Sequence, residues 1–324
     1  MTIDLGSTQL SLPVFLAPLA GITDLPFRNL VQSFGAGLVV SEMIASQEIV
    51  EAKYSVRDKA ELGLGIENTS VQIAGRDPYW MSEAAKLIED QGARAIDINM
   101  GCPAKKVVNG YSGSALMRDL DHALSLIEAV VNAVDLPVTL KTRLGWDDKL
   151  MNAPELAFRA QDAGIRMIVI HARTRCQFYK GHADWAKIHR VKQSVSIPVI
   201  ANGDIVSSDD AKRAITQSDA DGVMVGRGAQ GRPWALAEIA HRLTGSPMPN
   251  IPQGADLVDM IAGHYEAILG FYGIELGVRV ARKHLGWYMD QAVTDRQMRR
   301  AILTANDPQD VFVRLNDAIL QEAA

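Results

Sequence analysis

Short runs of apolar and β-branched residues alternate with longer amphipathic stretches from the N-terminus to about residue 240. This alternation is typical of repeated βα units, in which parallel strands form a sheet and helices cover it. Several amphipathic stretches begin with Ser, Thr or Asp and end near a glycine, as helix boundaries require. Eight strands are expected, over residues 14–17, 38–41, 70–73, 95–98, 138–141, 167–171, 199–201 and 222–225.

The residues that follow these strands decide between a closed barrel and an open, doubly wound sheet. A barrel gathers functional groups at the carboxyl ends of many strands, whereas an open sheet concentrates them at one switch point. Almost every expected strand here runs into polar or glycine-rich residues. We therefore expect the α/β class with a (β/α)₈ TIM barrel over residues 1–244.

The alternation of strand and helix patterns ends after residue 244. The proline- and glycine-rich segment 245–254 that follows predicts a domain boundary. Only helical patterns follow, over residues 256–272, 276–289, 295–303 and 307–323. A small, all-helical C-terminal domain is therefore expected over residues 245–324.

Composition limits the classes of protein to which the chain can belong. A net charge of −5 means that any contact with nucleic acid must be local. No apolar run approaches the roughly 20 residues that span a bilayer, and the N-terminus lacks the pattern of a secretory signal. The two cysteines, Cys102 and Cys176, are too few for a disulfide framework. We expect a cytoplasmic protein with no membrane segment and no metal site, monomeric by default.

Cys102 lies between Gly101 and Pro103, directly after the expected strand 95–98. A lone cysteine is commonly a small buried hydrophobic residue. However, the glycine permits close approach of a ligand and the proline stiffens the turn, and neither property matters much for packing alone. We therefore expect the Cys102 thiol at the barrel mouth, in a chemical role.

Lys141 and His171 end two neighbouring apolar strands, which would place both side chains near the barrel axis. A lysine there needs an anion, and a reduced flavin carries negative charge near N1 and O2. The alternatives are a structural ion pair for Lys141 and a backbone carbonyl partner for His171. The pair thus favours a flavin site.

Two glycine-containing turns close strands seven and eight, Asn202-Gly-Asp204 and Gly226-Arg-Gly228. Many barrels hold a phosphate at this place through backbone amides. Glycine lets the backbone approach the phosphate, and Arg227 adds a cation. A phosphate site is expected here.

With these strand ends assembled, the sequence resembles the tRNA-dihydrouridine synthases, and among them the B-type bacterial subgroup. Its most specific match is the string Asn-Met-Gly-Cys-Pro-Ala-Lys-Lys at 99–106. Leu19 stands where the family usually has methionine, and Ala172 where it usually has glycine. Other matching segments are 17–24, 27–28, 40–43, 71–75, 113–116, 141–146, 171–175, 197–204, 226–234 and 279–284.

The resemblance implies a bound FMN that NADPH reduces, and reduction of the C5–C6 double bond of a uridine in the D loop of tRNA, with a leaning toward position 17. Hydride would pass from flavin N5 to C6. Cys102 would give the proton to C5, because an ordinary thiol is mostly protonated at neutral pH. Asn99 and Arg143 would line the uracil site, with Arg173 a weaker candidate. The residues that would hold FMN are Pro18, Leu19, Ala20, Gln72, Lys141, His171, Asn202, Gly203, Asp204, Gly226 and Arg227.

Arg279, Arg282 and Lys283 follow helical spacing and form an expected basic stripe in the C-terminal domain. A solvated charged face is the alternative, but the resemblance favours contact with tRNA phosphates. The target base must leave the tRNA stack to reach a barrel mouth, as for other enzymes that act on bases. The domain 245–324 is thus expected to bind tRNA.

Two rival functions are considered. A small-molecule flavoenzyme of the dihydroorotate or dihydropyrimidine dehydrogenase type shares the barrel and the pyrimidine chemistry, but the helical tail with its basic stripe argues against it. An RNA-binding protein without turnover is disfavoured because Cys102, Lys141 and His171 occur together.

Overall fold

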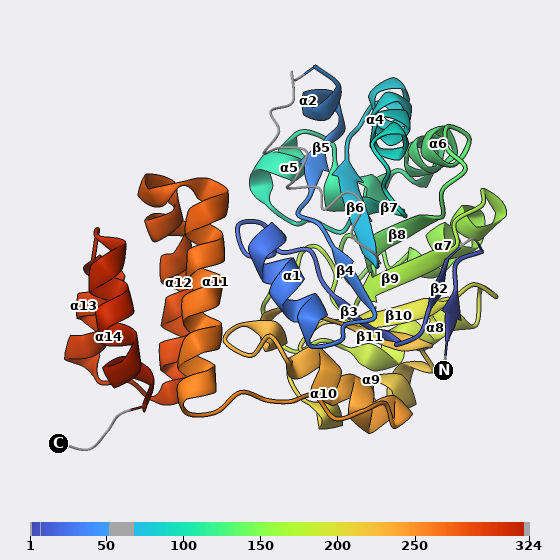
Figure 1. Ribbon diagram of the computed structural model, residues 1–324. Helices are drawn as coiled ribbons and strands as arrows, with labels where there is room; N and C mark the ends of the chain where they lie inside the picture. Colours follow the sequence, from blue (N-terminus) through green and yellow to red (C-terminus); the bar gives the residue numbers. More distant parts are fainter. Residues whose placement is uncertain (1, 7, 52–67, 321–324) are drawn as a thin grey trace.

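The computed structural model describes residues 2–6, 8–51 and 68–320. Eight parallel strands close into a barrel, since β4 pairs with β6 at Val39 and Thr69 and β11 pairs with β3 (Figure 1). A short ninth strand, β5 (Ile44–Ala45), pairs with the far end of β6. All eight expected strands are therefore confirmed. They are β3 (Val14–Leu16), β4 (Leu38–Val40), β6 (Thr69–Ala74), β7 (Ile96–Met100), β8 (Val138–Arg143), β9 (Met167–His171), β10 (Val199–Asn202) and β11 (Gly222–Val225).

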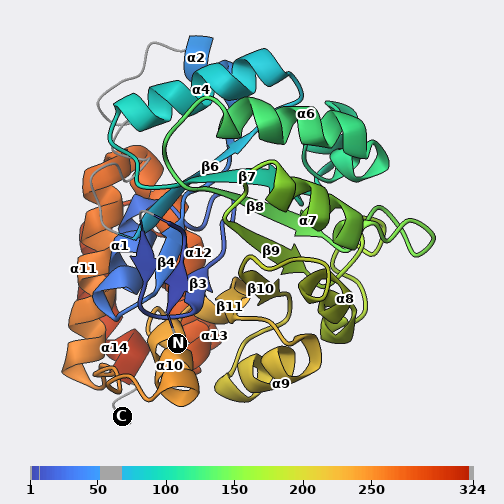
Figure 2. The same cartoon turned by 90° about the vertical axis from the view of Figure 1, so that its right-hand side faces the viewer.

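Helices cover the outside of the barrel (Figure 2). Asp24, Asp77, Asp119 and Ser207 each accept a backbone N–H at the start of the helix that follows, which satisfies donors that have no partner within the helix. The barrel helices are α1 (Leu25–Ser33), α2 (Ser46–Glu51), α4 (Pro78–Asp90), α5 (Lys105–Asn109), α6 (Leu120–Val131), α7 (Ala153–Asp162), α8 (His189–Lys192), α9 (Ser208–Ser218) and α10 (Ala235–Thr244), with 3₁₀ turns at Gly113–Arg118, Trp185–Ile188 and Arg227–Ala229.

Apolar side chains fill the barrel interior, and an N-terminal hairpin of β1 (Ile3–Asp4) and β2 (Gln9–Leu10) packs against them. The sequence patterns did not predict this hairpin. Ile3, Leu5 and Leu10 belong to the same buried cluster as interior strand residues such as Phe15 and Met224. One end of the barrel is therefore plugged by the hairpin, and the carboxyl ends of the strands are left to form the functional site.

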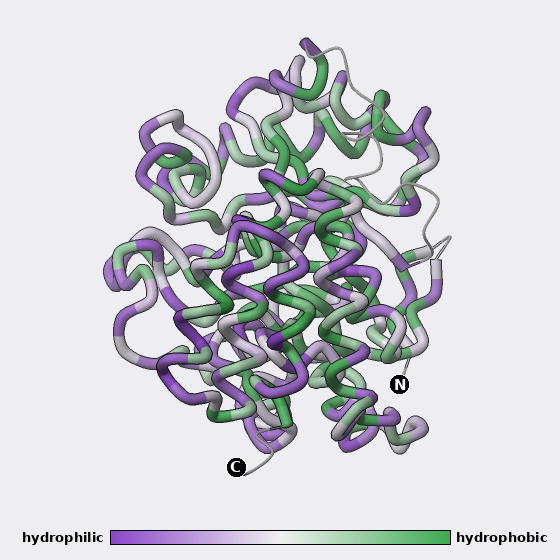
Figure 3. Tube along the Cα trace, turned by 60° about the vertical axis from the view of Figure 1, so that its left-hand side comes forward, coloured by the Kyte–Doolittle hydropathy of each residue, from purple (hydrophilic) through white to green (hydrophobic). Residues whose placement is uncertain are grey.

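The C-terminal helices form a second core beside the barrel: α11 (Ala255–Tyr272), α12 (Ile274–Ala292), α13 (Arg296–Thr304) and α14 (Pro308–Leu320). Hydrophobic and hydrophilic residues alternate along their turns (Figure 3), as expected for helices that bury one face. The expected all-helical region is confirmed; the last residues of the expected helix 307–323 lie outside the described part. Among the described helices, none combines the length and the apolarity needed to cross a membrane.

The helical region contacts the barrel along α1, where three buried polar residues meet. Asp24 caps α1, His264 comes from α11 and His284 from α12, and one polar atom of each lies within 4.8 Å of the others. His264 Nδ1 lies 2.9 Å from the hydroxyl of Tyr288. Phe27 of α1 packs against both imidazole rings. Burial lowers the pKa of His264 to about 3 and that of His284 well below its usual value, so both rings are neutral at the junction.

Candidate active site

A series of hydrogen bonds links side chains of three neighbouring strands, β6, β7 and β8. Thr139 on β8 donates to one carboxylate oxygen of Asp97 on β7, and Gln72 on β6 donates to the other, both at 2.6 Å. The side-chain N–H of Asn99 then donates to the amide oxygen of Gln72 at 2.8 Å. Burial raises the pKa of Asp97, although these hydrogen bonds and the charge of Lys141 act against it. These hydrogen bonds fix the orientation of the amide side chains of Gln72 and Asn99.

Asn99 also holds the loop that carries Cys102. Its amide oxygen accepts the backbone N–H groups of Gly101 at 3.2 Å and Cys102 at 3.0 Å. From the other side, Ser114 donates to the Cys102 carbonyl from its backbone N–H at 3.1 Å and from its hydroxyl at 2.8 Å. Gly113 has a φ of +58°, and a Cβ there would lie 2.8 Å from that carbonyl oxygen. Both backbone polar groups of the half-buried Cys102, its N–H and its carbonyl, are thus held by hydrogen bonds.

Arg143, at the end of β8, ties the Cys102 loop to the loop after β9. Its Nε donates to the carbonyl of Gly101 at 2.8 Å, and Nη1 donates to the carbonyls of Thr174 and Phe178 at 3.1 and 2.9 Å. Burial lowers the pKa of Arg143 to about 10, with the Arg173 charge acting in the same direction and Tyr179 opposing. An arginine stays cationic at that value. The guanidinium also lies 5.5 Å from the centroid of the Tyr179 ring and is hydrogen-bonded to that side chain.

Lys141 extends toward the barrel axis from β8. Its ammonium donates to the side-chain oxygen of Asn202 at 3.2 Å, and the Asn202 amide nitrogen is anchored on the carbonyl of Met224 at 2.7 Å. Burial lowers the pKa of Lys141 to about 8; the charge of Asp97 opposes that shift and Arg143 adds to it. The ammonium is half-buried and uses only one of its donors within the described chain, as a group that binds an anionic ligand would.

His171 lies at the end of β9, where the strand register places it between Arg143 of β8 and Asn202 of β10. Burial and the surrounding charges of Arg143, Lys141, Arg173 and Arg227 hold its pKa well below the usual value, so the ring is neutral. Nε2 lies 3.4 Å from Arg173 Nη1, which can only donate. The ring proton is therefore assigned to Nδ1, where it donates to no described residue and is available to a ligand.

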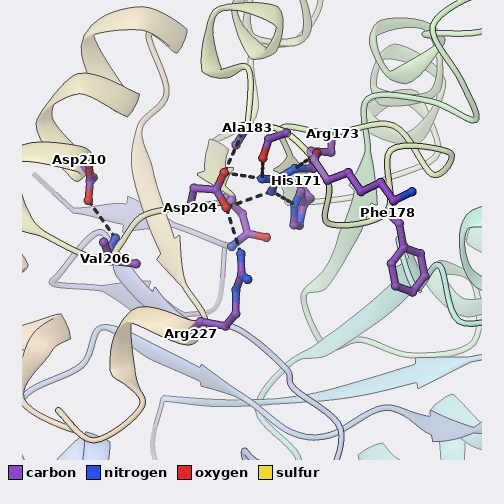
Figure 4. Close-up of polar contacts among 12 residues, drawn as sticks. His171, Arg173, Phe178, Ala183, Asp204, Val206, Asp210 and Arg227 are labelled. Carbon is purple, nitrogen blue, oxygen red and sulfur yellow. Dashed lines mark hydrogen bonds and ion pairs between the residues drawn. The ribbon is translucent and has the colours of Figure 1, made fainter. Parts of the chain in front are cut away.

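Arg173 is fully engaged within the chain (Figure 4). It donates to both carboxylate oxygens of Asp204 at 3.0 and 2.5 Å and to the carbonyls of Lys180 and Gly181 at 3.1 and 2.8 Å. With the contact to His171, its five N–H donors are all used. Only 1% of the residue is exposed. In this arrangement Arg173 has no donor left for a substrate, and it acts by positioning His171 and Asp204.

Asp204 joins Arg173 to Arg227, which donates to its carboxylate at 3.1 Å, and also accepts the backbone N–H of Ala183 at 2.8 Å (Figure 4). Burial alone would raise the pKa of Asp204, but the hydrogen bonds and the two arginines outweigh burial and lower it. Asp204 and Gly203 have φ values of +53° and +115°. A Cβ at Gly203 would also lie 3.3 Å from the His171 ring, so the turn requires glycine.

The turns after β10 and β11 present backbone donors without partners. The N–H groups of Gly203, Asp204, Gly226 and Arg227 donate to no acceptor in the described chain. An added Cβ at Gly226 would meet only ordinary contacts, 3.7 Å from Leu19 and Ala17. The chain's own packing thus does not demand glycine at 226, whereas at Gly228 a Cβ would lie 2.7 Å from the carbonyl of Ile205. This combination suits an oxyanion held against backbone.

Pro18, Leu19 and Ala20 follow β3. The side chain of Leu19 lies beside Gly226, which follows β11. Thr23 fixes the turn because its hydroxyl accepts the backbone N–H of Leu19 at 2.9 Å. The half-buried side chain of Leu19 presents an apolar surface beside Gly226.

The three basic residues of α12 do not form one free stripe. Lys283 donates to the carbonyl of Gly21 in the barrel, and Arg282 donates to the carbonyl of Ala305 at 3.3 Å. Arg279 is exposed and lies 3.9 Å from Glu275. Helical spacing placed them on one side of α12, but the barrel and the α13–α14 turn cover part of that side.

Three residues that hold the site were not predicted as site residues. Asp97 orients Gln72, and Gly113 and Ser114 support Cys102. A buried carboxylate in the apolar strand Ile96-Asp-Ile98 was a signal for the first. Ser114 lies 12 residues beyond Cys102, so only the fold brings them together.

Comparison with known proteins places the chain in a family. The family model described as Dihydrouridine synthase (Dus) matches residues 15–324. A probable tRNA-dihydrouridine synthase of Rhodobacter capsulatus is 59% identical over the whole of both chains. A tRNA-dihydrouridine synthase B of Xanthomonas campestris is 47% identical, covering 94% of this chain and 92% of that protein.

Solved structures support the fold. Morphinone reductase aligns with a TM-score of 0.53 at 13% identity, over 79% of this chain and 91% of that one. Histamine dehydrogenase from Rhizobium sp. 4-9 aligns with a TM-score of 0.57 at 15% identity, over 82% of this chain and 50% of that one. These likenesses show the barrel architecture alone. The sequence matches over nearly the full length show that the chain belongs to the dihydrouridine synthase family.

Proposed function

We propose that the protein is an FMN-dependent tRNA-dihydrouridine synthase that reduces the C5–C6 double bond of a uridine in the D loop of tRNA, with Cys102 as proton donor and NADPH as reductant. The observation that carries the proposal is the fixed Cys102 loop, which Asn99, Ser114 and Arg143 hold beside Lys141 at one barrel mouth. The names of the relatives and the family match agree with this chemistry.

The residues at the mouth fit FMN. Lys141 supplies a half-buried cation for the negatively charged part of the ring, and His171 offers a neutral N–H donor. The free backbone N–H groups at residues 203–204 and 226–227, with Arg227, suit the phosphate. Pro18, Leu19, Ala20 and Gln72 would contact the ring, and Asn202, Gly203, Asp204 and Gly226 complete the binding set. When bound, the flavin supplies the hydride for C6 of uracil.

The chain's own part in the chemistry is to hold a proton opposite the flavin. The Cys102 carbonyl and N–H are both hydrogen-bonded, so the loop cannot turn the thiol away without breaking contacts to Ser114 or Asn99. A proton from the thiol would reach C5 of the extruded uracil. Arg143, held beside Tyr179, would help to orient the base, while Asn99 acts on the base through the Cys102 loop. Arg173 positions the site and does not touch the substrate.

The helical region 245–324 is proposed as the tRNA-binding domain, and residues 1–244 as the catalytic domain. Arg279 is the exposed cation of α12, whereas Arg282 and Lys283 would need to exchange their present acceptors for phosphates. We propose a monomer that works in the cytoplasm without a metal, with position 17 as the favoured target.

The proposal is tested by reconstituting the protein with FMN and giving it NADPH and unmodified tRNA. Dihydrouridine should form only when all three are present, and free uridine should not replace tRNA. Reduction of free pyrimidines at a similar rate would instead indicate a small-molecule dehydrogenase.

A further inference from the structure

A surface cavity of about 400 Å³ lies beside the barrel mouth and takes no part in the site described above. Three loops that leave the carboxyl ends of β7, β8 and β9 build it. Cys102 and Arg173 lie on two of these loops and Arg143 ends β8, so a group bound in the cavity would lie on the same side of the barrel as the reacting base. Its lining residues are Val108, Asn109, Tyr111, Arg118, Trp146 and Arg175.

Two guanidinium groups in this cavity share one aromatic ring. The central carbon of Arg118 lies 4.3 Å from the centroid of the Trp146 ring, and that of Arg175 lies 4.8 Å from it. Arg118 also lies 5.8 Å from the ring of Tyr111. Stacking on an indole leaves the edges of a guanidinium, which carry the N–H donors, free to bind an anion.

Neither arginine has an acidic partner in the described chain. None of the six lining residues is acidic, and no ion pair among the described residues involves Arg118 or Arg175. The neighbouring carboxylates are used elsewhere: Asp119 accepts the backbone N–H of His122 at 3.0 Å, and Asp147 accepts those of the turn that follows it. The Nε of Arg175 is buried and makes no hydrogen bond. A buried donor without a partner requires an explanation, and an anion or an ordered water bound beside it is one.

The local backbone is built to present these side chains. Arg175 and Cys176 donate their backbone N–H groups to the carbonyls of Gly145 and Trp146, each at 2.9 Å. A Cβ at Gly145 would lie 2.0 Å from the carbonyl oxygen of Leu150, so the tight turn that carries Trp146 requires glycine. The two cations are therefore held together on a fixed frame, closer than about one Debye length at 0.1 M salt, ~10 Å.

We propose that this Arg118–Arg175 cavity binds a phosphate group of a nucleotide ligand, and specifically a backbone phosphodiester of the tRNA next to the extruded uridine. Two forked guanidinium groups match a phosphate in geometry and charge. Tyr111, 66% exposed at the rim, offers a ring on which a flanking base could stack. The choice of tRNA as ligand rests on the proposed function; the phosphate of NADPH is the other source of the same chemistry.

The test compares Arg118→Gln, Arg175→Gln and the double variant with wild type, all loaded with FMN. Filter binding gives the Kd for unmodified tRNA at several salt concentrations, and stopped-flow gives flavin reduction by NADPH. Arg190→Gln, which removes an exposed arginine on α8 without an ion-pair partner in the described chain, is the matched control for loss of one charge. Arg118→Lys tests whether charge alone suffices.

Each glutamine variant should weaken tRNA binding about fivefold to tenfold, and should reduce the slope of log Kd against log salt by roughly one. Arg190→Gln should change neither, and flavin reduction by NADPH should stay the same. Arg118→Lys should keep the salt slope and lose part of the affinity. A double variant with the Kd and slope of the control would overturn the proposal. A raised KM for NADPH with unchanged tRNA binding would overturn the tRNA assignment and place the reductant's phosphate here. Because binding is measured without turnover, these outcomes are separate from whether dihydrouridine forms.

Discussion

The side chain of Asn99 accepts the backbone N–H of Cys102 at 3.0 Å and donates to the amide oxygen of Gln72 at 2.8 Å. One residue therefore sets the position of the proposed proton donor, Cys102, relative to Gln72, a proposed flavin contact. Because Asn99 lies on β7, a rigid strand, the distance between the two groups is fixed by the barrel wall.

Replacing Asn99 by alanine should slow the tRNA-dependent oxidation of the reduced flavin roughly tenfold to a hundredfold, since displacement of a reacting group by about 1 Å has an effect of this size. FMN binding should weaken only slightly. Asn132→Ala, at an exposed helix end, is the control. Stopped-flow absorbance measures the rate of flavin oxidation by tRNA, and fluorescence titration measures FMN binding. An oxidation rate in Asn99→Ala equal to that of the control variant would refute a positioning role.

Lys141 should make FMN affinity depend on pH. Its pKa is lowered to about 8, so the free protein carries the charge below that value and loses it above. FMN binding to the apoprotein should therefore weaken as the pH rises from 7 to 9. Lys141→Met should bind FMN more weakly and remove this part of the pH dependence. Fluorescence titration measures the Kd, and an identical pH profile in the variant would contradict the assignment.

The ion pair of Arg173 with Asp204 should support stability more than most pairs in the chain. Asp204→Asn removes the partner of a buried guanidinium and should lower the free energy of unfolding by about 3 kcal/mol. The exposed pair of Asp121 with Arg159 should contribute less than about 1 kcal/mol, so Asp121→Asn is the matched control. Urea unfolding compares them. If Asp204→Asn and Asp121→Asn lowered the free energy of unfolding by the same small amount, Arg173 would have found other hydrogen-bond acceptors.

The sequence predicted the barrel wall well because strand ends are local signals, and Lys141, His171 and the turn at 202–204 lie where they were expected. It could not predict which donors remain free. Arg173 looked available for a substrate because its partner, Asp204, lies 31 residues away and meets it only in the closed barrel. Likewise, spacing on α12 placed Lys283 on a basic face but could not reveal that Gly21 of the barrel covers it.

The junction of the helical region with the barrel should weaken in mild acid. The pKa of His264 is lowered to about 3, while an unfolded histidine titrates near 6.5. The unfolded chain thus binds more protons below pH 6.5, and the free energy of unfolding should fall there by up to ~1.4 kcal/mol per pH unit for each histidine. The raised pKa of Asp24 acts in the opposite direction, because the folded chain binds that proton more readily.

His264→Gln should flatten the loss of stability between pH 6.5 and pH 5, and Asp24→Asn should steepen it or leave it unchanged. Replacement of the half-buried His189 on α8 by glutamine is the control for loss of a histidine. Chemical unfolding at each pH provides the measurement. A His264→Gln variant that loses as much stability as wild type between pH 6.5 and pH 5 would contradict a neutral His264 at the junction.

The most direct test of Cys102 as proton donor is a single-turnover experiment in which the FMN enzyme is reduced by NADPH without oxygen and then mixed with unmodified tRNA. Cys102→Ala should bind FMN and accept hydride from NADPH at the wild-type rate, and its oxidation by tRNA should be slower by about 10²–10⁴-fold. Cys176→Ala, which removes the exposed cysteine, should behave as wild type. Flavin oxidation by tRNA at the wild-type rate in Cys102→Ala would contradict the account.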